Sequence, residues 1–373
     1  MSNKIKNIIV CVVMALFIFG FSLLCLFLPK SEFLDSERRP AAAFPELSIE
    51  SIMKDGVDYV DSFMKKFDDN YAPDNFPFRD FFRSLKAFVN TNIFGQKDKD
   101  GVFVVGDYAA EMQETIDQGS IDHAVERLTF IYQKYLESKG IKPYISIIPD
   151  KGYFLAEQNG YLSMDYDQFI EKVLEGLDFA TYINIKDSLS IEDYYMSDTH
   201  WRQEQLVDIA KILVNGMGGS YNSTYTKNEL DVDFHGVYSG RAPKPLKAET
   251  IYYLTNANME NIKVFNHEQN KEISLYDMEK GHGKDAYDMF LSGELSKVTI
   301  TNPNAKTDKE LVVFRDSYGR SLIPLLADDY AKITIIDIRY QRPEFLLAGV
   351  NFENADVLFL YSTLVLNASS EMK

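Results

Sequence analysis

The chain has 373 residues, with 39 Lys and Arg against 56 Asp and Glu, so its formal net charge is −17 at pH 7. This acidity argues against a nucleic-acid partner and against docking of the chain as a whole on anionic lipid, because both repel a negative protein. Solubility explains the charge more simply than substrate selection does. Cys11 and Cys25 are the two cysteines, so the sequence beyond residue 30 has neither a disulfide nor a cysteine nucleophile.

The first 30 residues predict a membrane anchor. Lys4 and Lys6 precede an uncharged, mostly apolar run over residues 8–28, and about twenty such residues cross a bilayer core of roughly 30 Å as a helix. The run stays bulky to its end, unlike a cleaved secretory signal, and the large residues before Cys25 disfavour lipidation. We therefore expect a cytoplasmic tail over 1–7, an uncleaved transmembrane signal anchor over 8–28 and an extracytoplasmic remainder, a single-pass topology.

Residues 29–55 are polar and contain Pro40 and Pro45, which predicts an extended stalk leading to a body over 56–373. Apolar residues then recur at helical intervals over 52–94, with interruptions at Pro73 and at 75–77. A short strand is expected between Gly101 and Gly106.

From residue 117 onward strands and helices alternate. Near-continuous apolar strands that alternate with helices indicate an α/β fold with a parallel sheet covered by helices on both faces. Residues 220–300 interrupt the alternation and are interpreted as an insertion. Helices are expected over 121–139, 203–214, 320–327 and 343–347, and strands over 143–149, 182–185, 311–314, 332–338 and 357–361.

Ser317 follows the expected strand over 311–314 by three residues. Ligands of such sheets bind outside the carboxyl ends of the strands, so its hydroxyl is expected at this edge, near helix N-terminal N–H groups that could form an oxyanion hole. The sequence lacks the Gly-x-Ser-x-Gly elbow of lipases. Taken alone, Asp316-Ser317-Tyr318-Gly319 is more often a helix cap.

Asp198 and His200 supply a carboxylate and an imidazole two residues apart. In an extended segment they would point to one side, so the carboxylate could hold Nδ1 and leave Nε2 for Ser317. Trp201 is expected to fix this loop. A metal site or a surface loop fits the same pair, but the five histidines form no cluster, so zinc is the weaker interpretation and no cofactor is expected.

The two segments Asp198-Thr199-His200-Trp201 and Arg315-Asp316-Ser317-Tyr318-Gly319, in this order, resemble the DHHW family and the related alginate O-acetyltransferases, which are SGNH-hydrolase-like proteins. The resemblance runs from about residue 38 to the C-terminus. It implies a flavodoxin-like fold with a circularly permuted motif order. Further segments that carry the resemblance are 76–79, 149–151, 290–293, 300–303 and 336–340.

The resemblance implies a catalytic triad of Ser317, His200 and Asp198. Thr199 departs from the family signature at a position that is not the base in the acetyltransferases. The oxyanion glycine and asparagine of the fold do not align, so Gly293, with Ser292, and Asn302 are candidates for which a structural turn is the alternative. Further candidates for substrate or oxyanion contact are Tyr318, Trp201, Arg339 and Lys151, the last two with an ion pair or strand-end solvation as the alternative.

Three functions fit these residues. The first is a membrane-anchored O-acetyltransferase that acetylates an exopolysaccharide or cell-wall glycan through an acetyl-serine intermediate. An integral-membrane acyltransferase would supply the acetyl group. The second is a carbohydrate acetylesterase with the same triad. The third is a non-catalytic glycan-binding or assembly protein on the same scaffold. All three triad residue types are present, which favours catalysis.

Overall fold

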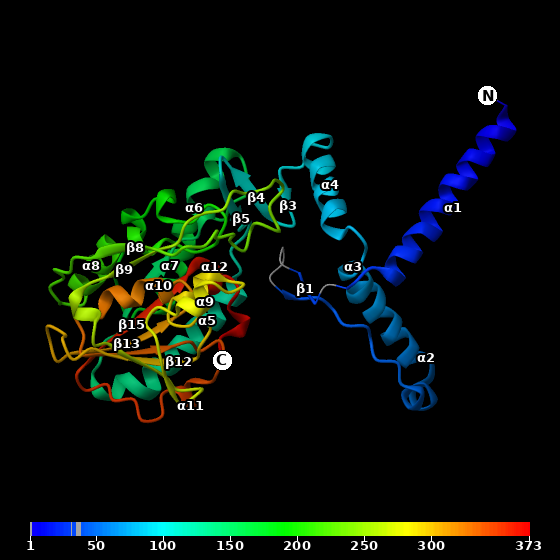
Figure 1. Cartoon of the computed structure of the whole chain (residues 1–373). Coiled ribbons are helices and arrows are strands. Elements are labelled where there is room, and N and C mark those ends of the chain that lie inside the picture. Colours follow the sequence, from blue (N-terminus) through cyan, green and yellow to red (C-terminus); the bar gives the residue numbers. More distant parts are fainter. Residues whose placement is uncertain (1, 31, 35–38) are drawn as a thin grey trace. The chain divides into compact units, whose positions relative to one another are not determined.

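The computed structural model describes residues 2–30, 32–34 and 39–373. The chain divides into two compact units, Met1–Lys99 and Asp100–Lys373 (Figure 1). The first unit contains the helices α1 (Asn3–Phe27), α2 (Ile49–Lys66), α3 (Ala72–Asp74) and α4 (Arg79–Asn92), with the short strands β1 (Phe33–Leu34) and β2 (Arg39–Pro40). The break expected at 75–77 is present, but the one expected at Pro73 is not, because Pro73 lies in the first turn of α3, where a missing N–H is tolerated.

Helix α1 is apolar and is long enough over Asn3–Cys25 to cross a membrane, as an anchor or as a signal sequence. The two compact units divide after Lys99, and the expected bounds of tail, anchor, stalk and body at residues 7, 28 and 55 stay predictions. Helix α2, which crosses residue 55, has no buried side chain in its described residues.

The second unit is built on an eight-stranded sheet of mixed direction. Its order is β11-β10-β12-β14-β13-β15-β6-β7. The five strands from β14 to β7 are parallel, whereas β12, β10 and β11 extend the sheet in antiparallel pairing. The strands are β6 (Tyr144–Ile148), β7 (Thr181–Tyr182), β10 (Lys263–Asn266), β11 (Lys271–Ile273), β12 (Lys297–Thr301), β13 (Glu310–Arg315), β14 (Lys332–Ile336) and β15 (Ala355–Ser362).

Two expectations are corrected here. The sheet is not wholly parallel, and the later part of residues 220–300 is not an insertion outside it, since β10, β11 and β12 belong to the sheet. Short chain connections make antiparallel pairing the natural outcome for β10 and β11, which are separated by four residues. The earlier part holds the hairpin of β8 (Thr226–Glu229) and β9 (Tyr252–Thr255).

Helices cover both faces of the sheet, as expected. On β13, Leu311 and Val313 pack in one apolar cluster and Val312 and Phe314 in the other, because successive side chains of a strand point to opposite faces. The first cluster includes α8 (Val207–Gly216) and α10 (Gly319–Leu322), and the second includes α5 (Gln118–Ile131) and α7 (Tyr166–Gly176). These layers surround the sheet in Figure 1.

The remaining elements are short. The hairpin of β4 (Val102–Val105) and β5 (Tyr108–Glu111) matches the strand expected before Gly106. The helix expected over 320–327 changes after Leu322 to a 3₁₀ segment over Ile323–Leu326, where Pro324 cannot donate a backbone hydrogen bond. The other helices are α6 (Lys151–Leu155), α9 (Met278–Gly281), α11 (Pro343–Leu346) and α12 (Thr363–Leu366).

Candidate active site

Ser317 stands between the carboxyl end of β13 and the start of α10, at the sheet edge where ligands of such folds bind. The preceding residue, Asp316, is fully buried and fixes this turn. Its carboxylate accepts hydrogen bonds from the Tyr318 N–H at 3.0 Å and from the Ser362 N–H, at the end of neighbouring β15, at 2.7 Å. Ser317 itself is partly exposed, so its hydroxyl is accessible from outside.

Asp198 and His200 lie in a loop closed by the pairing of Tyr194 with Trp201. The loop bends through these residues, so the extended segment assumed from the sequence is wrong. The two side chains meet because the Asp198 carboxylate turns back on its own loop, where it accepts a hydrogen bond from the His200 backbone N–H at 3.0 Å.

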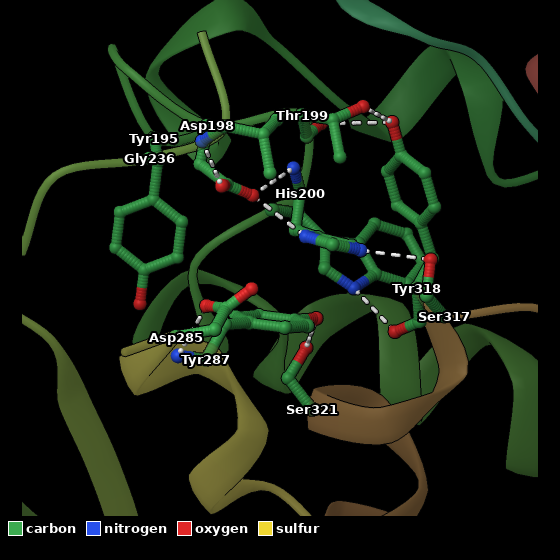
Figure 2. A network of polar contacts seen from close by, with 12 residues as sticks. Tyr195, Asp198, Thr199, His200, Gly236, Asp285, Tyr287, Ser317, Tyr318 and Ser321 are labelled. Carbon is green, nitrogen blue, oxygen red and sulfur yellow. Dashed lines mark hydrogen bonds and ion pairs between the residues drawn. The ribbon is translucent and has the colours of Figure 1, made fainter. Parts of the chain in front are cut away.

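Figure 2 shows Asp198, His200 and Ser317 in a row. His200 Nδ1 lies 2.6 Å from Asp198 Oδ1, and His200 Nε2 lies 2.8 Å from Ser317 Oγ. Asp198 is 0% exposed and His200 5% exposed. The carboxylate thus fixes the imidazole tautomer that leaves Nε2 free to accept the serine proton, the arrangement of a Ser-His-Asp triad.

Two hydrogen bonds join the His200 loop to the serine turn. Trp201 Nε1 donates to the Tyr318 carbonyl at 2.8 Å, and the Tyr318 hydroxyl donates to the Thr199 carbonyl at 2.8 Å. Trp201 is 0% and Tyr318 2% exposed. Both residues were candidates for substrate or oxyanion contact, but their burial and hydrogen bonds make them supports of the loop.

The segment interpreted as an insertion holds the other side of this loop. Glu249 accepts hydrogen bonds from the N–H groups of Met196, at 2.7 Å, and Ser197, at 2.6 Å, and from the Ser197 hydroxyl at 2.6 Å. The Val237 N–H donates to Asp198 Oδ2 at 2.8 Å. The carboxylate of Asp198 is therefore oriented by donors on both of its oxygens.

Gly236 lies against the Asp198 loop so closely that it leaves no room for a side chain. A Cβ at this position would stand 2.3 Å from the carbonyl carbon of Ser197 and 2.4 Å from Cα of Asp198. We predict that Gly236→Ala lowers the free energy of unfolding by about 1 to 3 kcal/mol through overpacking. Displacement of Asp198 should lower acyl transfer about 100-fold.

Denaturant unfolding and an activated-ester assay measure the two effects of Gly236→Ala. Gly119→Ala is the matched control, since Gly119 lies in α5 and its Cβ would approach only the Asp117 side chain, at 3.3 Å. If Gly236→Ala were as stable and as active as wild type, this would contradict the close approach of Gly236 to the backbone of Ser197 and Asp198.

Tyr287 stacks on the His200 ring, with 4.0 Å between centroids and 9° between planes (Figure 2). It is 1% exposed, and its hydroxyl lies 2.9 Å from Ser321 Oγ. Burial raises the pKa of this phenol, so it stays neutral. The ring restricts rotation of the imidazole and excludes water from one of its faces.

Lys151, a candidate for substrate contact, is instead buried behind the loop. It is 2% exposed, and its ammonium group donates to the carbonyls of Tyr195 at 2.8 Å and Met196 at 3.1 Å. The ammonium also lies 4.9 Å from the centroid of the Tyr238 ring. Lys151 therefore holds the backbone that leads to Asp198.

Burial lowers the pKa of Lys151 to about 7. The folded chain then binds fewer protons here than the unfolded chain between pH 7 and the ordinary lysine pKa near 10.4, so this residue makes stability rise with pH in that window. A shift of this size corresponds to up to about 5 kcal/mol. We predict that the unfolding free energy of wild type in detergent, relative to Lys151→Met, increases from pH 7 to 10. A pH-independent difference would contradict this.

Arg339, another candidate for substrate contact, is held by an ion pair just beyond the end of β14. Arg339 donates from Nε to Asp337 Oδ1 at 2.9 Å and from Nη2 to Oδ2 at 2.7 Å, and Asp337 also pairs with buried Arg315. The ion pair raises the pKa of Arg339. The structure therefore favours an ion pair over substrate contact as the role of Arg339.

The oxyanion candidates have partners outside the triad. The Gly293 N–H donates to the Phe290 carbonyl at 3.2 Å, and the Asn302 side chain donates to the Ala327 carbonyl at 2.8 Å. Gly293 has a φ of +80° and packs on Asp288, which pairs with Arg320. Asn302 follows Thr301, which pairs with Lys332 at the start of β14, so it lies at the opposite edge of the sheet from Ser317. Its selection from the sequence was wrong.

Most backbone N–H groups at the serine turn are already bound. Those of Tyr318 and Gly319 donate to Asp316, and that of Arg320 donates to the Ser317 carbonyl. Within the described part of the chain, the N–H of Ser317 has no acceptor. This N–H could therefore donate a hydrogen bond to an oxyanion at the serine turn.

The fold has solved neighbours. Bacillus cereus PatB1 with a sulfonyl adduct is 17% identical, with a TM-score of 0.59 over 71% of this chain and 95% of PatB1. A DHHW family protein from Eubacterium siraeum is 20% identical, with a TM-score of 0.57 over 71% of this chain and 91% of that protein. The O-acetyltransferase domain of Pseudomonas putida AlgJ is 11% identical, with a TM-score of 0.41, covering 72% of this chain and 92% of that domain.

No family model and no curated protein matches the sequence. At these identities the likeness to PatB1 and to the DHHW protein shows the fold alone. The chain therefore carries a serine, a histidine and an aspartate in triad geometry on a fold that it shares with a DHHW family protein.

Proposed function

We propose that the chain is an extracytoplasmic O-acetyltransferase that modifies a polysaccharide or cell-wall glycan. One observation carries the proposal: Ser317 Oγ lies 2.8 Å from His200 Nε2, while Nδ1 of the same ring lies 2.6 Å from Asp198. The fold shared with the DHHW protein and the motif resemblance to the alginate O-acetyltransferases support it.

The proposed reaction has two steps. Ser317 Oγ attacks the carbonyl carbon of an acetyl ester, its proton passes to His200 Nε2, and the same proton then goes to the leaving alcohol. In the second step His200 takes the proton of a sugar hydroxyl, whose oxygen attacks the acetyl-serine, and His200 then returns the proton to Ser317 Oγ as the bond to the acetyl group breaks. Asp198 stabilises the imidazolium in both steps.

Topology follows the same proposal. Residues 8–28 span the membrane, residues 1–7 are cytoplasmic and the triad faces the outside, where a glycan is accessible. An integral-membrane acyltransferase would supply the acetyl group across the bilayer. The order Asp198, His200, Ser317 along the chain would represent a circular permutation of the SGNH arrangement.

The proposal is tested by measuring how the acetyl group divides between a sugar acceptor and water. The full chain in detergent is incubated with an activated acetyl ester and with neutral oligosaccharides, and acetyl sugar and free acetate are measured. We expect acetyl sugar with wild type and none with Ser317→Ala. Acetate alone, dependent on Ser317, would indicate an acetylesterase, and no Ser317-dependent product would favour the non-catalytic scaffold.

A further inference from the structure

Within the first unit, the apolar helix α1 and the helix α4 meet in an aromatic cluster. The Phe21 ring of α1 stacks on Phe76, with 5.5 Å between centroids and 9° between planes, and it lies 5.8 Å from the Phe82 ring of α4. Phe76 and Phe82 also meet edge to face at 5.8 Å. The beginning of α4 is therefore held beside the C-terminal part of α1.

The position of Phe21 along α1 defines how deeply the residues packed on it would lie in a membrane. It lies six residues before Phe27, the last residue of α1, and at 1.5 Å per residue this is about 9 Å inside the end of the helix. Helices that lie in a membrane interface bury their apolar face roughly 5 to 10 Å into the headgroup and acyl boundary. If α1 spans a bilayer, residues packed on Phe21 reach this depth.

A row of large apolar side chains at the start and along α4 is exposed. Phe78 is 60%, Phe81 63%, Leu85 45% and Phe88 58% exposed. Phe81, Leu85 and Phe88 are spaced by four and three residues, which places them on one side of α4, and Phe78 directly precedes the helix. Such a contiguous apolar surface is uncommon on a soluble domain and indicates contact with a partner or a membrane.

The polar side of α4 is basic, in contrast to the rest of the chain. Helix α4 contains Arg79, Arg83 and Lys86 against Asp80, a net charge of +2 in a chain of −17. The three cations are spaced by four and three residues, so they also share one side of the helix. Arg79 pairs with Asp74 and Asp80 and is mostly buried, so Arg83 and Lys86 carry the charge argument. An aromatic face combined with a basic face is the pattern of helices that lie on anionic membranes.

We propose that α4 is a membrane-surface helix that inserts Phe81, Leu85 and Phe88, with Phe78 just before them, into the outer leaflet and directs Arg83 and Lys86 to anionic headgroups. The proposal rests on α1 as a membrane span and is independent of acyl transfer. Helix α2 also exposes apolar residues, but its net charge is −1, so charge complementarity does not extend to it. The overall acidity argues against docking of the whole chain, whereas α4 is a local exception.

A matched pair of labels tests the orientation of α4. Leu85→Cys and Asn90→Cys are made in the full chain with Cys11→Ser and Cys25→Ser, labelled with an environment-sensitive fluorophore and reconstituted in vesicles of phosphatidylcholine and phosphatidylglycerol. Leu85 lies in the apolar row, whereas Asn90 lies four residues after Lys86 and therefore on the basic side of α4. Aqueous iodide and lipid-borne nitroxide serve as quenchers, and vesicle flotation reports anchoring.

We expect the label at Leu85 to be quenched by the nitroxide and shielded from iodide, and the label at Asn90 to show the reverse. Equal quenching of both labels by iodide would overturn the proposal. Shielding of Leu85 from both quenchers would also overturn it, because a second copy or another protein surface would then cover the row. If the chain does not float with the vesicles, α1 is not a membrane span and the proposal for α4 loses its basis. This result would not affect the proposed acyl transfer at Ser317.

The charge requirement has its own readout. Nitroxide quenching at Leu85 should increase from pure phosphatidylcholine to vesicles with phosphatidylglycerol, and the combined Arg83→Gln and Lys86→Gln variant should lose this increase. Retention of the full increase in that variant would contradict the role of the cations. Ester turnover of the variant should equal that of wild type.

Discussion

Asp198→Asn is expected to lower acyl transfer by about four orders of magnitude while leaving the chain folded, as the same substitution does in the serine-protease triad. Oδ1 of Asp198 accepts from the backbone N–H and Nδ1 of His200, and Oδ2 accepts from the Val237 N–H. An asparagine must point its NH₂ group at one of these donors. When it faces the imidazole, Nδ1 becomes the acceptor and Nε2 carries the proton, so Ser317 loses its base.

The rate of acetyl-serine formation under single-turnover conditions measures this effect, and denaturant unfolding verifies the fold. Asp316→Asn is not a suitable control, because Asp316 holds the serine turn. Asp187→Asn, at an exposed site, is the matched change. Less than about a tenfold loss in Asp198→Asn would show that His200 does not depend on Asp198 for its tautomer.

Glu249→Ala is expected to cause the largest loss of stability, about 3 kcal/mol or more, since each buried donor left without a partner costs about 1 to 3 kcal/mol. The change leaves the N–H groups of Met196 and Ser197 and the Ser197 hydroxyl without their carboxylate. Because these residues lead directly to Asp198, acyl transfer should fall with stability.

Urea unfolding of Glu249→Ala and of the exposed control Glu272→Ala gives the two free energies to compare. Glu249→Gln keeps the shape but turns an NH₂ group toward a backbone donor, so it should recover only part of the loss. Equal stability of Glu249→Ala and Glu272→Ala would mean that the loop is held without Glu249.

The alternation of apolar strands and helices was sufficient to predict the core of the second unit. The strand before Ser317 and the parallel strands β14 and β15 lie where the pattern indicated, because a strand buried on both faces is a continuous apolar run. Strands β10 to β12 were not recognised. They lie at the antiparallel end of the sheet, and β10 and β11 are too short, at four and three residues, for a pattern to be recognised. Strand β12 alternates lysine or threonine with valine and isoleucine, the pattern of a half-buried strand, and was overlooked.

Asp198, His200 and Ser317, which the structure brings within hydrogen-bond reach, could be selected from the sequence because the chemistry requires a serine, an imidazole and a carboxylate, and few segments combine them. The supports of the triad were missed. Gly236, Glu249 and Tyr287 lie 36 to 87 residues after His200 in a segment without periodicity, and only the folded loop brings them to Asp198 and His200. Lys151 was selected from the sequence as a candidate for substrate contact, but its side chain is buried and supports the loop instead.

Intact-mass spectrometry after incubation with an activated acetyl ester tests the central claim most directly. Wild type should gain one acetyl group, peptide mapping should place it on Ser317, and Ser317→Ala should gain none. An acetyl group that persists in Ser317→Ala, or its absence from a correctly folded wild type under conditions where the ester is consumed, would contradict the acetyl-serine mechanism.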